Sequence, residues 1–209
     1  MRIVKIEKSK HKQGRVLVYP EEGDLLRITE AELLPFGIYP GAELSDEQVA
    51  ALKTAARHSE IRLQAARMAS SRMLSKKELA DRLRRKGVES DEAKAAAERM
   101  EELGAVNDAA YAGAVVRHYA AMGYGRGRVE QELYRRGISR ELWDEALAEL
   151  SDSADVIDAF LQSKLKGRRP DRAETKRLSD ALLRRGFGWS DIRSALNRLG
   201  ETEIEEQED

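Results

Sequence analysis

Residues 133–150 read LYRRGISRELWDEALAEL, which predicts the end of one helix, a turn at Gly137 and a second amphipathic helix. The same phrase occurs as LRRKGV at 83–88 and as LLRRGF at 182–187. The three glycines lie 50 and then 49 residues apart. A period of this length is typical of helical repeat proteins, in which each unit packs against its neighbours.

Apolar residues keep the same period. Leucine or valine lies four and eight residues before each glycine, and apolar residues follow six, ten and thirteen residues after it. Both spacings place the side chains on one helix face. Ile61, Tyr111 and Phe160, each 26 residues before its glycine, mark an earlier helix. We therefore predict an all-α fold of tandem three-helix repeats in an elongated, curved array. The predicted repeats span 58–106, 107–152 and 153–200.

Residues 1–44 have a different pattern. RIVKIEK and RVLVY alternate apolar and polar residues as half-buried strands do, and PEEGD after the second run predicts a hairpin turn. Two or three strands alone are marginally stable, so we expect this small strand-rich head either to lean on the helices or to be partly mobile.

A lead-in helix is predicted at 45–57, because Ser45 and Gln48 form a capping box. No proline or glycine follows until after Met73, so the segment forms one long helix or two with a break near His58. A second capping box is predicted at Ser75.

Composition narrows the class of protein. Charged residues make up 36% of the chain, aromatic residues 5%, and cysteine is absent, which excludes disulfides and thiol chemistry. The net charge of −1 includes an acidic tail at 201–209, ETEIEEQED, which we expect to be disordered. Without this tail the balance is about +5. We expect a cytoplasmic protein with no membrane-spanning segment.

The sequence gives no sign of an enzyme, a cofactor or a metal. The three histidines lie far apart and lack metal-ligand spacing. GYGRGR at 123–128 has glycines like those of a phosphate-binding loop, but no strand precedes it, so it is a weak nucleotide motif.

The paired arginines before the glycines allow two interpretations. Cations at a helix C-terminus stabilise it by roughly 0.3–1 kcal/mol each, which explains one arginine per helix better than two. Alternatively, they form with nearby loop cations a ladder, exposed in equivalent places on the three repeats, that binds a regular polyanion or helical polymer. The candidate residues are Arg72, Lys76, Lys77, Arg84, Arg85, Arg126, Arg128, Arg135, Arg136, Lys164, Lys166, Arg168, Arg169, Arg184 and Arg185.

The ordered motifs resemble those of one known family. LSKKEL, LGAVNDAAYA, the GYGRGR segment with its following EL and RGI, and FGIYPGAELS before the long helix are together similar to RecX regulatory proteins. The resemblance covers essentially the whole chain, although no single motif is diagnostic.

This resemblance implies a regulator that binds the RecA recombinase filament on single-stranded DNA and modulates it in DNA repair and recombination. Inhibition of filament assembly, ATP hydrolysis and strand exchange is the expected direction. We expect a monomer that binds single-stranded DNA only weakly, because RecX proteins are often more basic than this chain. The acidic tail is not explained by the resemblance. A stand-alone nucleic-acid-binding protein and a helical-repeat scaffold for another protein remain as alternatives.

Overall fold

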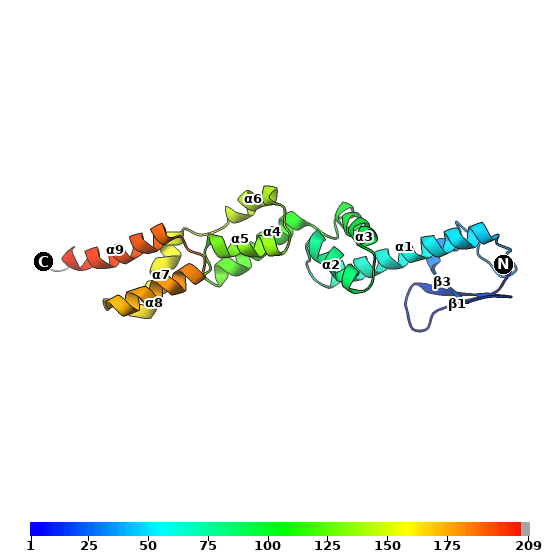
Figure 1. Ribbon diagram of the computed structural model, residues 1–209, viewed down its shortest axis with the longest axis horizontal. Coiled ribbons are helices and arrows are strands. Elements are labelled where there is room, and N and C mark those ends of the chain that lie inside the picture. The colour runs from blue at the N-terminus through cyan, green and yellow to red at the C-terminus, as the bar shows by residue number, and fades with distance from the viewer. Residues whose placement is uncertain (206–209) are drawn as a thin grey trace. The chain divides into compact units, whose positions relative to one another are not determined.

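The computed structural model describes residues 1–205, and the side chains of residues 1–199. Helices dominate and a small three-stranded sheet lies at the N-terminus, which confirms the predicted fold class (Figure 1). The chain divides into two compact units, residues 1–106 and 107–209. The predicted disorder of the acidic tail concerns in part residues 206–209, which lie outside the described residues, and stays a prediction.

The N-terminal sheet is an antiparallel meander. Its strands are β1 (Ile3–Lys8), β2 (Arg15–Pro20) and β3 (Leu26–Thr29), in the order β1-β2-β3. Ile6 pairs with Val18, and Val16 pairs with Ile28. A 3-10 turn, η1 (Glu30–Glu32), follows the sheet and is capped by the Thr29 side chain.

The sheet packs on the first helix, which is one of the two outcomes that the sequence left open. Helix α1 (Asp46–Ser71) is a single unbroken helix, which decides between the two forms left open by the sequence. The sheet lies beside α1 (Figure 1). Leu52 and Ala56 of α1 are buried together with the strand residues Ile3 and Val18. Burial of this shared apolar surface stabilises a sheet that would be marginal alone.

The rest of the first unit is built on the other end of α1. Helices α2 (Lys76–Arg85) and α3 (Ser90–Glu102) bury an alanine-rich core that also contains Ile61 and Leu83. Gly87 joins the two helices at φ +87°, a conformation that residues with a Cβ rarely adopt. The capping boxes of Ser45 with Gln48 and of Ser75 with Glu78 are both formed.

The second unit contains two sets of three helices, with separate cores. Tyr111, Val129 and Leu133 lie in the first core, and Ile157 and Leu182 lie in the second. The first set is α4 (Asp108–Ala121), α5 (Arg126–Arg135) and α6 (Trp143–Leu147) after a 3-10 turn, η2 (Arg140–Leu142); the second is α7 (Ser153–Leu165), α8 (Arg172–Arg184) and α9 (Trp189–Glu205).

Helix α6 is shorter than the apolar spacing predicts. The pattern through Leu150 indicates a full amphipathic helix, but α6 has only five residues and ends at Leu147. Leu150 instead closes a turn through its backbone N–H, which donates to the Leu147 carbonyl at 3.1 Å. The side chain of Asp152 then caps the start of α7, so residues 148–152 form the connection between α6 and α7.

Candidate functional site

The glycines of GYGRGR bring two backbones together within the second unit. The N–H of Gly125 donates to the carbonyl of Arg185 at 2.8 Å, and the N–H of Gly127 donates to the carbonyl of Gly186 at 3.0 Å. A Cβ on Gly125 would lie 2.7 Å from the Gly186 carbonyl oxygen. These glycines therefore join the start of α5 to the turn between α8 and α9, so a structural role explains the motif.

The side chain of Arg185 also connects the end of α8 to the segment between α4 and α5. Its Nη1 donates to the carbonyl oxygens of Met122 at 3.2 Å and Gly123 at 3.0 Å, which follow the end of α4. The guanidinium also lies 5.7 Å from the ring centre of Tyr124 and 4.9 Å from that of Phe160. A half-buried arginine that satisfies carbonyl groups at a helix end and packs on two rings has a structural role.

Arg136 is likewise part of the internal structure. Its Nη1 donates to the Tyr111 hydroxyl, and its guanidinium lies over the Tyr111 ring at 5.4 Å. The side chain is only 20% exposed, and its Nε lies 3.7 Å from a carboxylate oxygen of Glu132. Arg136 therefore links α5 to α4.

The expected exposure of all six paired arginines is therefore wrong for two of them. Arg136 and Arg185 each immediately precede their glycine, and Lys86 holds that place in the first repeat. Arg84 stands one residue farther from its glycine than Arg135 does, so the pairs are not in equivalent places. One step along a helix turns a side chain by about 100°, which is enough to move it from solvent to a neighbouring helix.

A buried carboxylate, Glu132, was not predicted as part of this cluster. It receives hydrogen bonds from Arg135 at 2.7 and 3.0 Å, and Arg128 lies 3.4 Å away. Burial by itself raises the pKa of the Glu132 carboxyl, but the hydrogen bond and charge of Arg135 outweigh it, so the pKa lies below its ordinary value. Glu132 therefore stays ionised at neutral pH and holds nearby arginines. Its signal in the sequence is weak, a glutamate three residues after the apolar Val129 of α5.

Most of the other candidate cations are exposed but have acidic partners. Such surface ion pairs contribute little to the stability of the fold, so each cation can exchange its carboxylate for another anion. The pairs are Lys76 with Glu101 at 2.7 Å, Lys77 with Asp81 at 2.8 Å, Arg84 with Asp81 at 3.1 Å, Arg126 with Glu130 at 2.8 Å and Arg168 with Glu174 at 2.5 Å.

Arg85 and Lys164 contact groups other than carboxylates. Arg85 donates to the Asp81 carbonyl at 3.2 Å, and Lys164 lies over the Phe160 ring at 5.8 Å. Arg169 is exposed in the loop before α8. Among the candidates, three exposed cations make no side-chain hydrogen bond, ion pair or ring contact with any described residue. These are Arg72, Lys166 and Arg184.

These three free cations all lie at helix C-termini. Arg72 follows the last residue of α1, Lys166 follows the last residue of α7, and Arg184 is the last residue of α8. The structure thus separates the paired arginines of the third repeat into an exposed residue, Arg184, and a structural residue, Arg185.

Neither a membrane helix nor a metal cluster is present among the described residues. Every helix there is too short or too polar to cross a bilayer. No three His, Asp or Glu side chains in that part of the chain meet where they could share a metal ion.

Comparison with known families matches two helical segments of the chain. Residues 62–100 match the family model of the first three-helix domain of RecX, and residues 107–147 match that of the second three-helix domain of RecX.

Curated relatives cover the whole chain or its larger part. A regulatory protein RecX of Streptococcus gordonii is 26% identical over 212 residues, spanning 100% of this chain and 81% of the relative. That of Caldanaerobacter subterraneus is 29% identical, spanning 94% of this chain and 97% of the relative. That of Xanthomonas axonopodis is 34% identical over 123 residues, spanning 58% of this chain and 76% of the relative.

Solved structures support the same fold. A crystal structure of regulatory protein RecX matches 94% of this chain and 98% of its own, with a TM-score of 0.75 and 22% identity. A crystal structure of RecX from Lactobacillus salivarius matches 68% of this chain with a TM-score of 0.59.

The fold and the surface together define a helical protein of three-helix domains, with cations displayed at its helix ends. The two adjacent domain matches and the relative at 34% identity show which family this protein belongs to. The chain belongs to the RecX family of regulatory proteins.

Proposed function

We propose that this protein regulates the RecA recombinase by binding its filament on single-stranded DNA in the cytoplasm. It acts as a binding regulator rather than an enzyme, and the expected effect is inhibition of filament growth and ATP hydrolysis. The observation that carries the proposal is the pair of adjacent matches to the first and second RecX domains. The name regulatory protein, which the relatives share, supports a role in control.

The exposed helix-end cations are the proposed contact points. Arg72, Lys166 and Arg184 have no anionic partner among the described residues, so binding an acidic surface or a phosphate would break no existing pair. Exposed cations with surface partners, such as Lys77 and Arg126, can also contact the filament, because breaking a surface ion pair costs little free energy. Several modest contacts on one chain gain avidity without any single strong contact.

Arg136 and Arg185 take no direct part in this proposal. Their guanidinium groups are already engaged inside the second unit, by Tyr111 and by the carbonyls after α4. They hold the helices that display the exposed cations.

The test is single-stranded-DNA-dependent ATP hydrolysis by the cognate RecA, with this protein titrated from far below equimolar amounts. Suppression at one regulator per many recombinase subunits is the expected result, because a regulator of filament growth acts at filament ends. No effect at equimolar protein would contradict the proposal and would leave a nucleic-acid-binding protein or a helical scaffold.

A further inference from the structure

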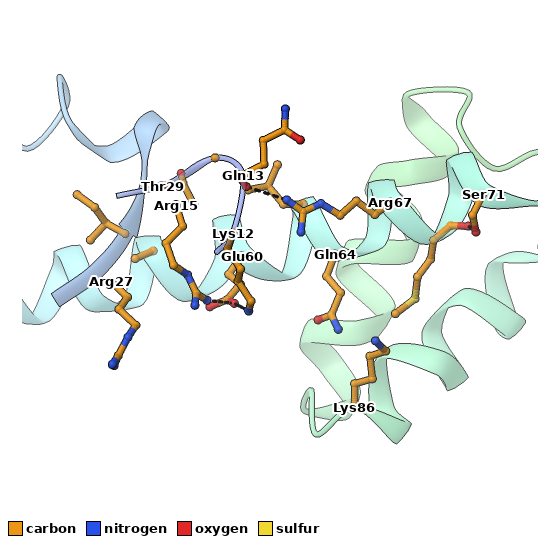
Figure 2. A pocket seen from close by; sticks show the side chains of 15 residues that line it. Lys12, Gln13, Arg15, Arg27, Thr29, Glu60, Gln64, Arg67, Ser71 and Lys86 are labelled. Atoms are coloured by element: carbon orange, nitrogen blue, oxygen red, sulfur yellow. Dashed lines mark hydrogen bonds and ion pairs between the residues drawn. The ribbon is translucent and has the colours of Figure 1, made fainter. Parts of the chain in front are cut away.

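The first unit contains a basic groove apart from the helix-end cations. It lies between the loop that joins β1 to β2 and the middle of α1, and its volume is about 350 Å³ (Figure 2). Five basic side chains line it against one carboxylate, Glu60. The basic residues are Lys12, Arg15, Arg27, Arg67 and Lys86.

We propose that this groove binds the phosphate backbone of a single-stranded nucleic acid. It is a site separate from the helix-end contacts, and its binding of nucleic acid does not require the recombinase.

The charge of the local sequence suits a polyanion. Residues 1–15 contain six lysines and arginines and a single acidic residue, Glu7, although the whole chain has a net charge of −1. A field of one sign along a groove attracts a regular polyanion and raises its rate of association. Three of the five lining cations are arginines, whose planar guanidinium groups match phosphate oxygens with two parallel hydrogen bonds.

Glu60 occupies the centre of the groove in the unbound protein. Its carboxylate receives a hydrogen bond from Lys12 at 3.0 Å and another from Arg15 (Figure 2). Arg67 donates to the backbone carbonyl of Gln13 at 2.8 Å, which holds the loop over α1. Lys12 and Arg15 are thus placed by Glu60 in positions from which they can transfer to a phosphate.

Two cations at the ends of the groove are free. Arg27 on β3 and Lys86 after α2 lie on opposite sides of Glu60; Arg27 points away from it, and Lys86 points toward Gln64 (Figure 2). Both are exposed, and within the described part of the chain neither side chain makes a hydrogen bond or an ion pair. A backbone lying along the groove would meet free cations at both ends and the Lys12–Glu60–Arg15 cluster between them.

Glu60 limits the affinity, because it competes for Lys12 and Arg15. Burial alone raises the pKa of the Glu60 carboxyl. The hydrogen bonds and charges of Lys12 and Arg15 lower it by more than burial raises it, so the pKa lies below its ordinary value. The carboxylate is therefore ionised at neutral pH and repels an incoming phosphate. Its neutral amide analogue would release both cations.

The experiment measures the affinity of the full chain for a fluorescein-labelled oligothymidylate by fluorescence polarisation, over a series of salt concentrations and without recombinase. We expect the double variant Arg27→Glu with Lys86→Glu to bind about tenfold more weakly. The slope of log affinity against log salt should become shallower by about 1.4, since each single-strand phosphate contact contributes about 0.7. Glu60→Gln should bind about threefold more tightly.

The matched control is Lys53→Glu with Lys94→Glu, which makes the same change in net charge on exposed residues of the same unit outside the groove. It should keep the affinity and slope of the native protein to within about twofold. Circular dichroism melting of each variant checks that the fold is unchanged.

Three results would overturn the proposal. One is equal weakening by the groove and control variants, which would mean that only net charge matters. Another is unchanged DNA affinity in the groove variant. The third is a labelled polyglutamate that binds the groove as tightly as the oligothymidylate, which would identify an acidic protein segment as the partner. Because no recombinase is present, none of these results depends on the ATP hydrolysis test of the proposed regulation.

Discussion

At the scale of single residues, the two arginines before Gly186 have different roles. Arg185 donates to the carbonyls of Met122 and Gly123 and packs on two rings, whereas the side chain of Arg184 is exposed and makes no polar contact in the described structure. The electrostatic benefit of a cation at the helix end can come from either residue. Only the residue next to the glycine reaches the neighbouring repeat.

We therefore expect Arg185→Ala to destabilise the second unit by about 1–3 kcal/mol, because two carbonyl groups lose a charged donor. Arg184→Ala should change the stability by less than about 0.5 kcal/mol. Both tryptophans, Trp143 and Trp189, lie in the second unit, so urea unfolding followed by tryptophan fluorescence reports on it directly. Equal losses of stability in the two variants would contradict this division of roles.

At the scale of elements, the turn between α8 and α9 is fixed by close backbone packing. Gly186 has φ +86°, and a Cβ there would lie 2.2 Å from the backbone nitrogen of Arg128. A side chain would strain the turn and also push the start of α5 away.

Gly186→Ala should therefore destabilise the second unit by about 3 kcal/mol or more. Gly167→Ala is the matched control, because Gly167 has φ +82° in the same unit but open space around its missing Cβ. This control carries only the backbone penalty of about 1–2 kcal/mol. The difference between the two, read from the same urea unfolding, measures the packing between the repeats; no difference would show that the close approach is unimportant.

Features that depend on near neighbours in the sequence were predictable, and those that depend on distant partners were not. The capping boxes at Ser45 and Ser75 were predicted because each needs only a residue three positions later. Arg185 contacts carbonyl groups more than 60 residues earlier, and no local pattern records that. Helix α6 ends early for a related reason, since the cap of the next helix at Asp152 overrides the apolar spacing.

The basic groove was missed because its charges come from separate segments. The loop after β1, the strands β2 and β3, α1 and the residue after α2 contribute one cation each. Each segment alone has the pattern of an ordinary solvated surface, and only the packing of the sheet on α1 brings them together.

At the scale of the whole molecule, a chain with a net charge of −1 still has unpaired cations in the groove and at the helix ends. Many surface cations are paired with carboxylates, which weakens the general attraction to polyanions. The free cations of the groove and of the helix ends give local contacts instead. A regulator of this design should bind an ordered polymer better than an isolated strand, because many weak contacts act together only on a regular partner.

The measurement that tests this account most directly is the affinity for RecA filaments assembled on immobilised single-stranded DNA. We compare the native protein with Arg72→Glu plus Arg184→Glu, and with the control Lys53→Glu plus Lys94→Glu, which changes the net charge equally. The helix-end variant should bind at least about tenfold more weakly, while the control stays near the native value. Equal affinity of the native protein and the helix-end variant would contradict the claim that these cations bind the filament.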